Sequence, residues 1–183
     1  MDREEALDSI RANVENEDLV KHMLATEVIM RALARHFGED EEEWGLAGLL
    51  HDIDVELTDN DMGAHSRLGA DLARELGASE AVAHAILAHN PRHGASLETM
   101  LDKALFCADP LTRFIVAAAL VLPDKKLAGL EASSIAKRFE EKGFAAGAKR
   151  EKMARCADIG LELDEFIGLG LQAMKKVAAR LGL

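Results

Sequence analysis

One short stretch, Leu49-Leu50-His51-Asp52-Ile53-Asp54, constrains the fold of this chain more than any other. It places an imidazole beside a carboxylate directly after a strongly apolar run. Divalent first-row metal ions accept this pair of ligands, and a helix with an apolar opposite face can hold the pair inside a bundle. The stretch therefore predicts a helix that carries polar metal ligands into a protein core.

The composition of the 183-residue chain favours helix over strand. Leu, Ala, Glu, Lys and Arg are abundant, whereas Pro occurs 3 times and Tyr is absent. No segment shows the period-two alternation that is typical of a half-buried strand. We predict an all-α fold, a compact helical bundle in which residues 1-183 form a single domain.

Apolar residues at helical spacing, together with capping residues, define the expected helices. The first half should contain a helix of about three turns capped by Asp2, a helix over 18–37 stopped by Gly38, a helix that follows the acidic run 39–43 and reaches His51, and a helix over 64–76. The second half should contain a helix capped by Ser79, one capped by Ser96 and ended by Asp109-Pro110, one over 111–122, and two or three amphipathic helices within 124–183. Small residues at 45, 47 and 48 should let a neighbouring helix approach closely, and residues 54–63 should form a loop across the mouth of a site.

Six polar residues occur in these otherwise apolar segments, and together they form the predicted metal site: His22, His51, Asp52, His65, His89 and Asp109. Four imidazoles and two carboxylates suit two first-row ions that share a bridging carboxylate. We expect His65 and His89 to hold one ion and Asp52 to bridge it to the other. The remaining three residues would complete the ligands of that other ion.

The other histidines have simpler explanations. His36 lies near a helix end, where a cation suits the helix dipole, and His93 lies in a loop where we expect it to be exposed. His84 precedes His89 by five residues, about 140° around an ideal helix, so the two side chains should not face one pocket.

The order of the six residues resembles the HD-domain superfamily of metal-dependent phosphohydrolases. Gly48-Leu49-Leu50-His51-Asp52-Ile53-Asp54 is similar to the HDIG branch, with Asp54 where that branch usually has Gly. His65-Ser66-Arg67-Leu68-Gly69-Ala70 and Ala85-Ile86-Leu87-Ala88-His89-Asn90 resemble the segments of its third and fourth histidines. Cys107-Ala108-Asp109 resembles its closing aspartate.

The resemblance covers about residues 18–115 and implies an HD-type helical bundle, metal binding at the matching positions and phosphate-ester hydrolysis. Residues 124–183 lie outside it, and we expect them to pack on the bundle as a C-terminal helical extension. Val55 stands where a lysine often follows the motif, and Asn90 follows His89 where cyclic-dinucleotide phosphodiesterases carry a double histidine and a GYP segment. Cyclic di-GMP is therefore disfavoured as the substrate.

The leading hypothesis is a metal-dependent phosphohydrolase that acts on a phosphate ester or anhydride of a small molecule, with a nucleotide as one option. One or two divalent ions of Mn, Fe, Co, Ni or Zn would serve as cofactors, and Asp52 would be the central catalytic residue. Arg67 would clamp the phosphate, and Asp54 would orient the imidazole of His51. The alternatives are a di-iron oxygenase with the same ligands and a non-catalytic nucleotide-binding signalling module.

Charge, hydropathy and cysteine spacing indicate which partners and which compartment this chain has. A formal charge of -11 disfavours binding to a nucleic acid polymer, which requires cationic surface. The longest apolar run is too short to cross a bilayer, and the N-terminus lacks the features of a signal peptide. Cys107 and Cys156 have no paired spacing, which indicates free thiols in a reducing compartment. We therefore expect a cytoplasmic protein with a small-molecule phosphate substrate and no membrane partner.

Overall fold

The computed structural model describes residues 1–183, and all of its regular secondary structure is helical, which confirms the predicted fold class. The α-helices are α1 (Arg3–Asn13), α2 (Glu17–Phe37), α3 (Glu41–Leu50), α4 (Arg67–Glu75), α5 (Glu80–Ala88), α6 (Met100–Leu120), α7 (Ala132–Glu140), α8 (Arg150–Met153), α9 (Leu163–Lys175) and α10 (Ala178–Leu181). Short 3-10 helices cover Pro91–His93, Leu127–Gly129 and Ala154–Ile159. No helix combines the length and the apolar character that crossing a membrane requires.

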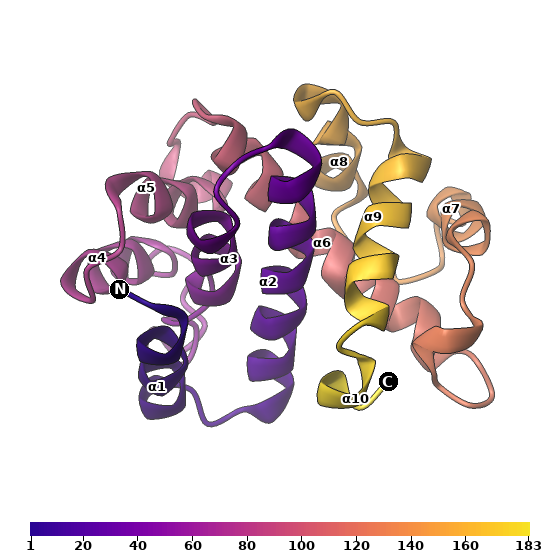
Figure 1. The fold of residues 1–183 in the computed structure, drawn as a ribbon, viewed down its shortest axis with the longest axis horizontal. Coiled ribbons are helices and arrows are strands. Elements are labelled where there is room, and N and C mark those ends of the chain that lie inside the picture. Colours follow the sequence, from indigo (N-terminus) through magenta and orange to yellow (C-terminus); the bar gives the residue numbers. More distant parts are fainter.

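Two long helices, α2 and α6, form the middle of the molecule, and each contains 21 residues. Helices α1, α3, α4 and α5 lie on one side of this pair, and α7, α9 and α10 lie on the other (Figure 1). Helix α2 packs against α3, α6 and α9, so it contacts both sides of the molecule. Residues from distant parts of the sequence therefore meet along α2 and α6.

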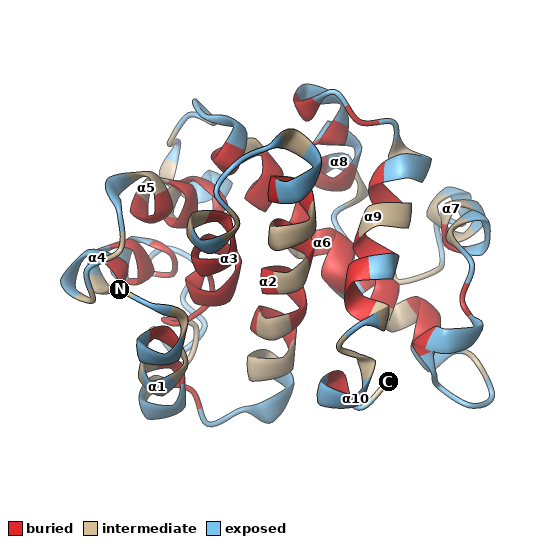
Figure 2. Ribbon diagram, in the orientation of Figure 1, coloured by how far each residue is buried: buried red, intermediate tan, exposed pale blue.

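One continuous core of 43 buried residues runs from Ala6 in α1 to Leu181 in α10. Figure 2 shows that the buried residues gather on α3 and on the inner faces of α2, α6 and α9. The C-terminal segment shares this core through Ile135, Phe166 and other side chains. Residues 124–183 thus pack directly on α2 and α6.

The helix ends follow the chemistry of the sequence. Asp2 accepts from the backbone N–H of Glu5 and forms a complete capping box, and Ser79 accepts from the N–H of Val82, so both predicted caps are confirmed. Gly38 ends α2 with a φ of 74°, a left-handed conformation that favours glycine.

Both boundaries predicted for the helix between Ser96 and Pro110 are wrong. Pro110 does not end a helix, because α6 continues through it to Leu120. Proline removes one backbone hydrogen bond, but the buried side chains of Leu105 and Leu111 on either side of it belong to the same core and hold the helix together. The N-cap of α6 is Thr99, paired with Asp102 in a capping box, and not Ser96.

The helix predicted over 64–76 begins later, at Arg67. Residues 51–66 form a series of turns in which Asp59, Asn60 and Ser66 all have positive φ. This segment, called here the 51–66 loop, joins α3 to α4 and carries several residues of the site described below.

Helices α2 and α3 approach closely at Gly48. A Cβ atom there would lie 2.9 Å from the Thr26 carbonyl oxygen, 2.9 Å from the Met30 side chain and 3.0 Å from the Glu27 Cα atom. Two of these neighbours are backbone atoms, so they cannot move without displacing α2. The predicted close approach of a neighbouring helix is confirmed, and Gly48 sets the distance between the two helices.

We predict that Gly48→Ala lowers the free energy of unfolding by about 1–3 kcal/mol, because the added methyl group forces the helices apart. Gly168→Ala is the matched control, since Gly168 lies inside α9 with nothing within 4 Å of an added Cβ. That substitution should stabilise the protein by about 0.5–1 kcal/mol through helix propensity alone. Urea unfolding of both variants measures the two effects, and equal shifts would contradict the packing argument.

Candidate metal centre

The six residues predicted as metal ligands come together where α2, α3, α5 and α6 meet. His22 lies on α2, His51 and His89 are the residues that end α3 and α5, and Asp109 lies on α6. Asp52 and His65 belong to the 51–66 loop. All six are buried except Asp109, whose side chain is 17% exposed.

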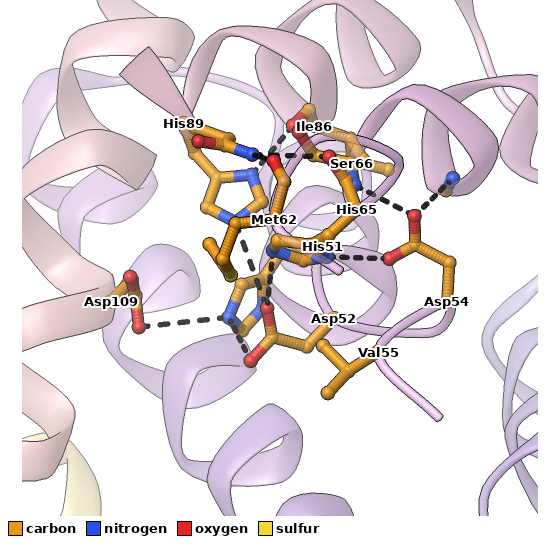
Figure 3. Close-up of polar contacts among 12 residues, drawn as sticks. His51, Asp52, Asp54, Val55, Met62, His65, Ser66, Ile86, His89 and Asp109 are labelled. Atoms are coloured by element: carbon orange, nitrogen blue, oxygen red, sulfur yellow. Dashed lines mark hydrogen bonds and ion pairs between the residues drawn. The ribbon is translucent and has the colours of Figure 1, made fainter. Parts of the chain in front are cut away.

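Figure 3 shows the Asp52 carboxylate among His51, His65 and His89. Each of its oxygens faces a different pair of histidines, and His22 completes the second pair. The Oδ1 atom of Asp52 lies 3.5 Å from Nε2 of His65 and 3.6 Å from Nε2 of His89. Its Oδ2 atom lies 3.5 Å from Nε2 of His22 and 3.4 Å from Nε2 of His51. The cluster therefore consists of two groups of potential ligands that share one carboxylate.

Asp109 adds a second carboxylate to the group formed by His22 and His51. Its Oδ1 atom lies 3.1 Å from Nε2 of His22 and 3.8 Å from Nε2 of His51. The two imidazoles approach each other to 3.2 Å between their Nε2 atoms. Two nitrogens and two carboxylates thus converge on one small region.

The outer nitrogens of His51 and His89 are fixed by the ends of their own helices. Nδ1 of His51 donates to the Gly48 carbonyl oxygen at 2.8 Å, and Nδ1 of His89 donates to the Ile86 carbonyl oxygen at 2.6 Å. Because Nδ1 makes these bonds, Nε2 of each imidazole is the nitrogen that faces the cluster. Such bonds orient histidine ligands in metal sites.

Asp54 orients His65 and not His51, so the predicted partner of Asp54 is wrong. Its Oδ1 atom accepts from Nδ1 of His65 at 2.8 Å, and its Oδ2 atom accepts from the backbone N–H groups of Ser66 and Gly69, both at 2.7 Å. Asp54 lies on the side of His65 away from Asp52 (Figure 3). The turns of the 51–66 loop bring Asp54 to the start of α4, where it also replaces the missing side-chain cap of Ser66.

Burial and mutual contact shift the pKa values of several clustered residues. Burial raises the pKa of Asp52 and of Asp109, but the adjacent histidines outweigh it and hold both well below their usual range. Burial lowers the pKa of His22 and of His89 and keeps both imidazoles neutral. Burial also lowers the pKa of His51, but Asp52 and Asp109 outweigh it and raise the pKa to about 10. His51 is therefore protonated when no ion is bound, and it must release this proton to act as a ligand, because neutral imidazoles and ionised carboxylates are the forms that bind metal. With that proton released, the donor set fits a divalent first-row ion.

A cavity of about 590 Å³ opens onto the cluster. The start of α2 contributes Asp18, and the 51–66 loop contributes Val55, Glu56, Asn60 and Met62, so the loop lies at the mouth of the site as predicted. The C-terminal segment also lines the cavity, through Gly147, Ala148, Lys149 and Lys152. The volume of the cavity is within the range of pockets that enclose small molecules.

Comparison with known proteins identifies the family. The HD domain family model matches residues 19–143. The chain belongs to the HD-domain family. This confirms the resemblance seen in the motifs, and the match extends beyond residue 115 into the C-terminal segment.

Curated relatives of this HD domain include proteins named Ribonuclease Y. The protein from Sulfurovum sp. (strain NBC37-1) is 31% identical over 139 residues, covering 74% of this chain and 27% of the relative. The protein from Thermoanaerobacter pseudethanolicus is 31% identical over 167 residues, covering 88% of this chain and 32% of the relative. The chain therefore spans about a third or less of the length of these relatives. The comparison with solved structures found no significant match.

The arginine predicted to bind phosphate lies outside the cavity, and a different arginine lines it. Arg67, predicted to clamp a phosphate, is exposed and does not line the cavity of the HD domain. Arg113 lines the cavity instead, and its Nη2 atom donates to Oδ2 of Asp52 at 3.0 Å. Its Nε atom donates to Oδ1 of Asp109 at 3.5 Å. The sequence could have indicated Arg113, because it follows Asp109 by four residues and therefore lies on the same face of the helix.

The three other histidines lie outside the cluster of the HD domain. Nδ1 of His84 lies 3.1 Å from a carboxylate oxygen of Asp102, away from the site, as the helical spacing predicted. His36 is exposed near the end of α2, also as predicted. The prediction of an exposed His93 is wrong, because this side chain is half-buried and its Nε2 atom donates to the His65 carbonyl oxygen at 2.6 Å.

Lys152 was missed because it lies far along the sequence from the motifs. Its side chain is 5% exposed, lines the cavity, and donates from Nζ to the His89 carbonyl oxygen at 2.7 Å. Burial lowers the pKa of Lys152 to about 8, so the ammonium group remains mostly charged at neutral pH. This cation reaches the HD-domain site from the C-terminal segment.

We predict that Asp54→Asn weakens metal binding by the His65 and His89 group by about 10- to 100-fold. The amide can donate to Nδ1 of His65, which moves the imidazole proton to Nε2 and removes the lone pair from the cluster. Asp71→Asn is the control, since Asp71 lies exposed on α4 and pairs only with Arg74. Calorimetric titration with Mn²⁺ measures the affinities, and unchanged binding in Asp54→Asn would remove Asp54 from the site.

Proposed function

We propose that this HD domain is a divalent-metal-dependent phosphohydrolase that acts on a phosphate ester or anhydride of a small molecule, nucleotides included. The observation that carries the proposal is the Asp52 carboxylate, which directs its two oxygens at two separate groups of histidines. A carboxylate shared in this way is characteristic of sites that hold two ions for hydrolysis.

The residues divide between two ions in a simple way. His22, His51 and Asp109 would join Asp52 around the first, and His65 and His89 would join Asp52 around the second. Mixed imidazole and carboxylate donors suit Mn, Fe, Co, Ni and Zn alike. Divalent ions at such a site lower the pKa of water and neutralise the charge on phosphoryl oxygens.

Groups around the six ligands would orient the imidazoles and contact the substrate. The Gly48 and Ile86 carbonyl groups and the Asp54 carboxylate each accept from Nδ1 of one imidazole, so Nε2 of each of the three rings faces the cluster before anything binds. Arg113 reaches the cavity beside Asp52 and Asp109 and offers a guanidinium group to an incoming phosphate. We therefore transfer the phosphate-clamping role proposed for Arg67 to Arg113.

The shape and charge of the cavity support a small substrate. It is lined by the 51–66 loop and by Gly147, Ala148, Lys149 and Lys152, and its volume suits a mononucleotide-sized ligand. The net charge of -11 and the carboxylates of Asp18 and Glu56 at the cavity disfavour a long polyanion. The name of the Ribonuclease Y relatives makes RNA the second candidate substrate.

Metal content tests the proposed centre first. We predict about two ions per chain in the wild-type protein loaded with Mn²⁺, about one in His65→Ala and almost none in Asp52→Ala. His36→Ala is the control, because His36 is an exposed histidine outside the cluster. Elemental analysis after gel filtration gives the values. A wild-type protein that retains no ion from Mn²⁺, Fe²⁺ or Zn²⁺ would rule out the centre.

Phosphate release then tests the reaction and separates the candidates. The metal-loaded protein should release phosphate from nucleotides or small phosphate esters, and Asp52→Ala should lose that activity while remaining folded. Faster cleavage of short RNA than of mononucleotides would favour the ribonuclease alternative. Oxygen consumption by the reduced, iron-loaded protein would favour an oxygenase, and nucleotide binding without turnover would favour a signalling module.

A further inference from the structure

Lys152 is a buried cation without a carboxylate partner. No Asp or Glu oxygen lies within 4.0 Å of its Nζ atom, and its hydrogen bond goes to the neutral His89 carbonyl group. Its side chain is only 5% exposed. An ammonium group has three N–H donors, so most of its hydrogen-bonding capacity is not used by the protein.

Burying such a charge costs free energy that a neutral side chain would avoid. A buried ion normally has a partner of opposite charge, because desolvation is otherwise uncompensated. Contact with an aromatic face recovers a part of this cost, and Nζ lies 4.4 Å from the centre of the Phe106 ring. The remaining N–H groups require an acceptor, and the cavity is the space that can supply one.

The other cations of the cavity are placed differently. Arg113 pairs with the carboxylates of Asp52 and Asp109, and its side chain is 56% exposed. Lys149 also lacks a carboxylate partner, but it is exposed at the edge of the cavity. Val55, which also lines the cavity, carries no charge. Lys152 is therefore the buried positive charge in the cavity that an anion can reach.

The protein fixes this part of the wall through Arg150. The guanidinium group of Arg150 donates to backbone carbonyl groups of the preceding segment, those of Arg138, Phe139, Glu141, Phe144 and Ala145. It also lies 5.1 Å from the centre of the Phe114 ring on α6. Arg150 thus acts as a positioning residue, and it holds residues 138–150 in one conformation next to Lys149 and Lys152.

We propose that Lys152 binds a non-bridging oxygen of the substrate phosphate, with Lys149 as a weaker contact at the cavity edge. This inference rests on the proposed phosphohydrolase function and adds the residue that recognises the anion. It assigns the C-terminal segment, which lies outside the histidine and aspartate motifs, a direct part in substrate binding. It also makes the substrate an anion that fits between Lys152 and the Asp52 cluster.

Binding of inorganic phosphate to the Mn²⁺-loaded protein tests the inference. Lys152→Gln keeps an N–H donor for the His89 carbonyl group and removes the charge, so it separates recognition of the anion from support of the fold. We expect its Kd for phosphate to rise about 10- to 100-fold, the loss of one charge-assisted hydrogen bond. Lys152→Arg, which keeps the charge, should recover most of the affinity.

The matched control is Lys175→Gln. Lys175 also donates from Nζ to a backbone carbonyl group, that of Leu130 at 2.7 Å, but it lies on α9 and does not line the cavity. This variant should bind phosphate as the wild type does. In the wild-type protein, phosphate should also slow acetylation of Lys152 relative to Lys175, which mass spectrometry measures without any substitution.

The outcomes distinguish this inference from the proposed function. If the wild type binds metal and hydrolyses phosphate esters while Lys152→Gln binds phosphate equally well, the inference is wrong and the function stands. If Lys152→Gln does not fold, the acetylation measurement decides, and equal rates with and without phosphate would overturn the inference. If phosphate binding depends on Lys152 but no metal binds, the anion site stands and the metal-dependent function falls.

Discussion

The buried carboxylate of Asp52 is the interaction on which the site depends. A charge in a protein core requires compensation, and here four imidazoles from four separate segments surround the two oxygens. That requirement fixes the relative positions of α2, α3, α5 and the 51–66 loop more tightly than apolar packing alone, because distances between polar atoms tolerate little variation. The close approach at Gly48 serves the same end, since it brings the α2 histidine to the end of α3.

The ends of α3 and α5 show how ordinary helix chemistry prepares a metal ligand. The last carbonyl groups of a helix lack partners within the helix. In both helices the histidine at the end donates from Nδ1 to the carbonyl group three residues before it. One hydrogen bond therefore satisfies the helix end and orients the imidazole.

The sequence was sufficient for the parts of the structure that arise from local patterns. The helical class, the caps at Asp2 and Ser79 and the close approach at Gly48 all follow from neighbouring residues. The six clustered residues could be selected because polar side chains are conspicuous in apolar helices, and the family motif strengthened that choice. Whether they hold metal remains a prediction.

The wrong predictions concern features that are determined by contacts between distant parts of the chain. The partner of Asp54 depends on the turns of the 51–66 loop, whose positive φ at Ser66 has no clear sequence signature. Pro110 was assigned to a helix end because proline breaks isolated helices, but a continuous core on both sides keeps α6 intact. Lys152 reaches the site through its contact with the distant residue His89, and no local sequence pattern predicts such a contact.

The bond between Asp54 and His65 also carries an entropic cost of folding. These residues are 11 positions apart, and their contact closes the intervening segment into a ring. Ring closure has an entropic cost that folding must meet before any ligand arrives. A bound ion that joined Asp52 to His65 would act as a second crosslink across nearly the same segment. Its binding energy would then appear as resistance of this segment to local opening, which makes proteolysis at the exposed Leu57 a sensor of occupancy.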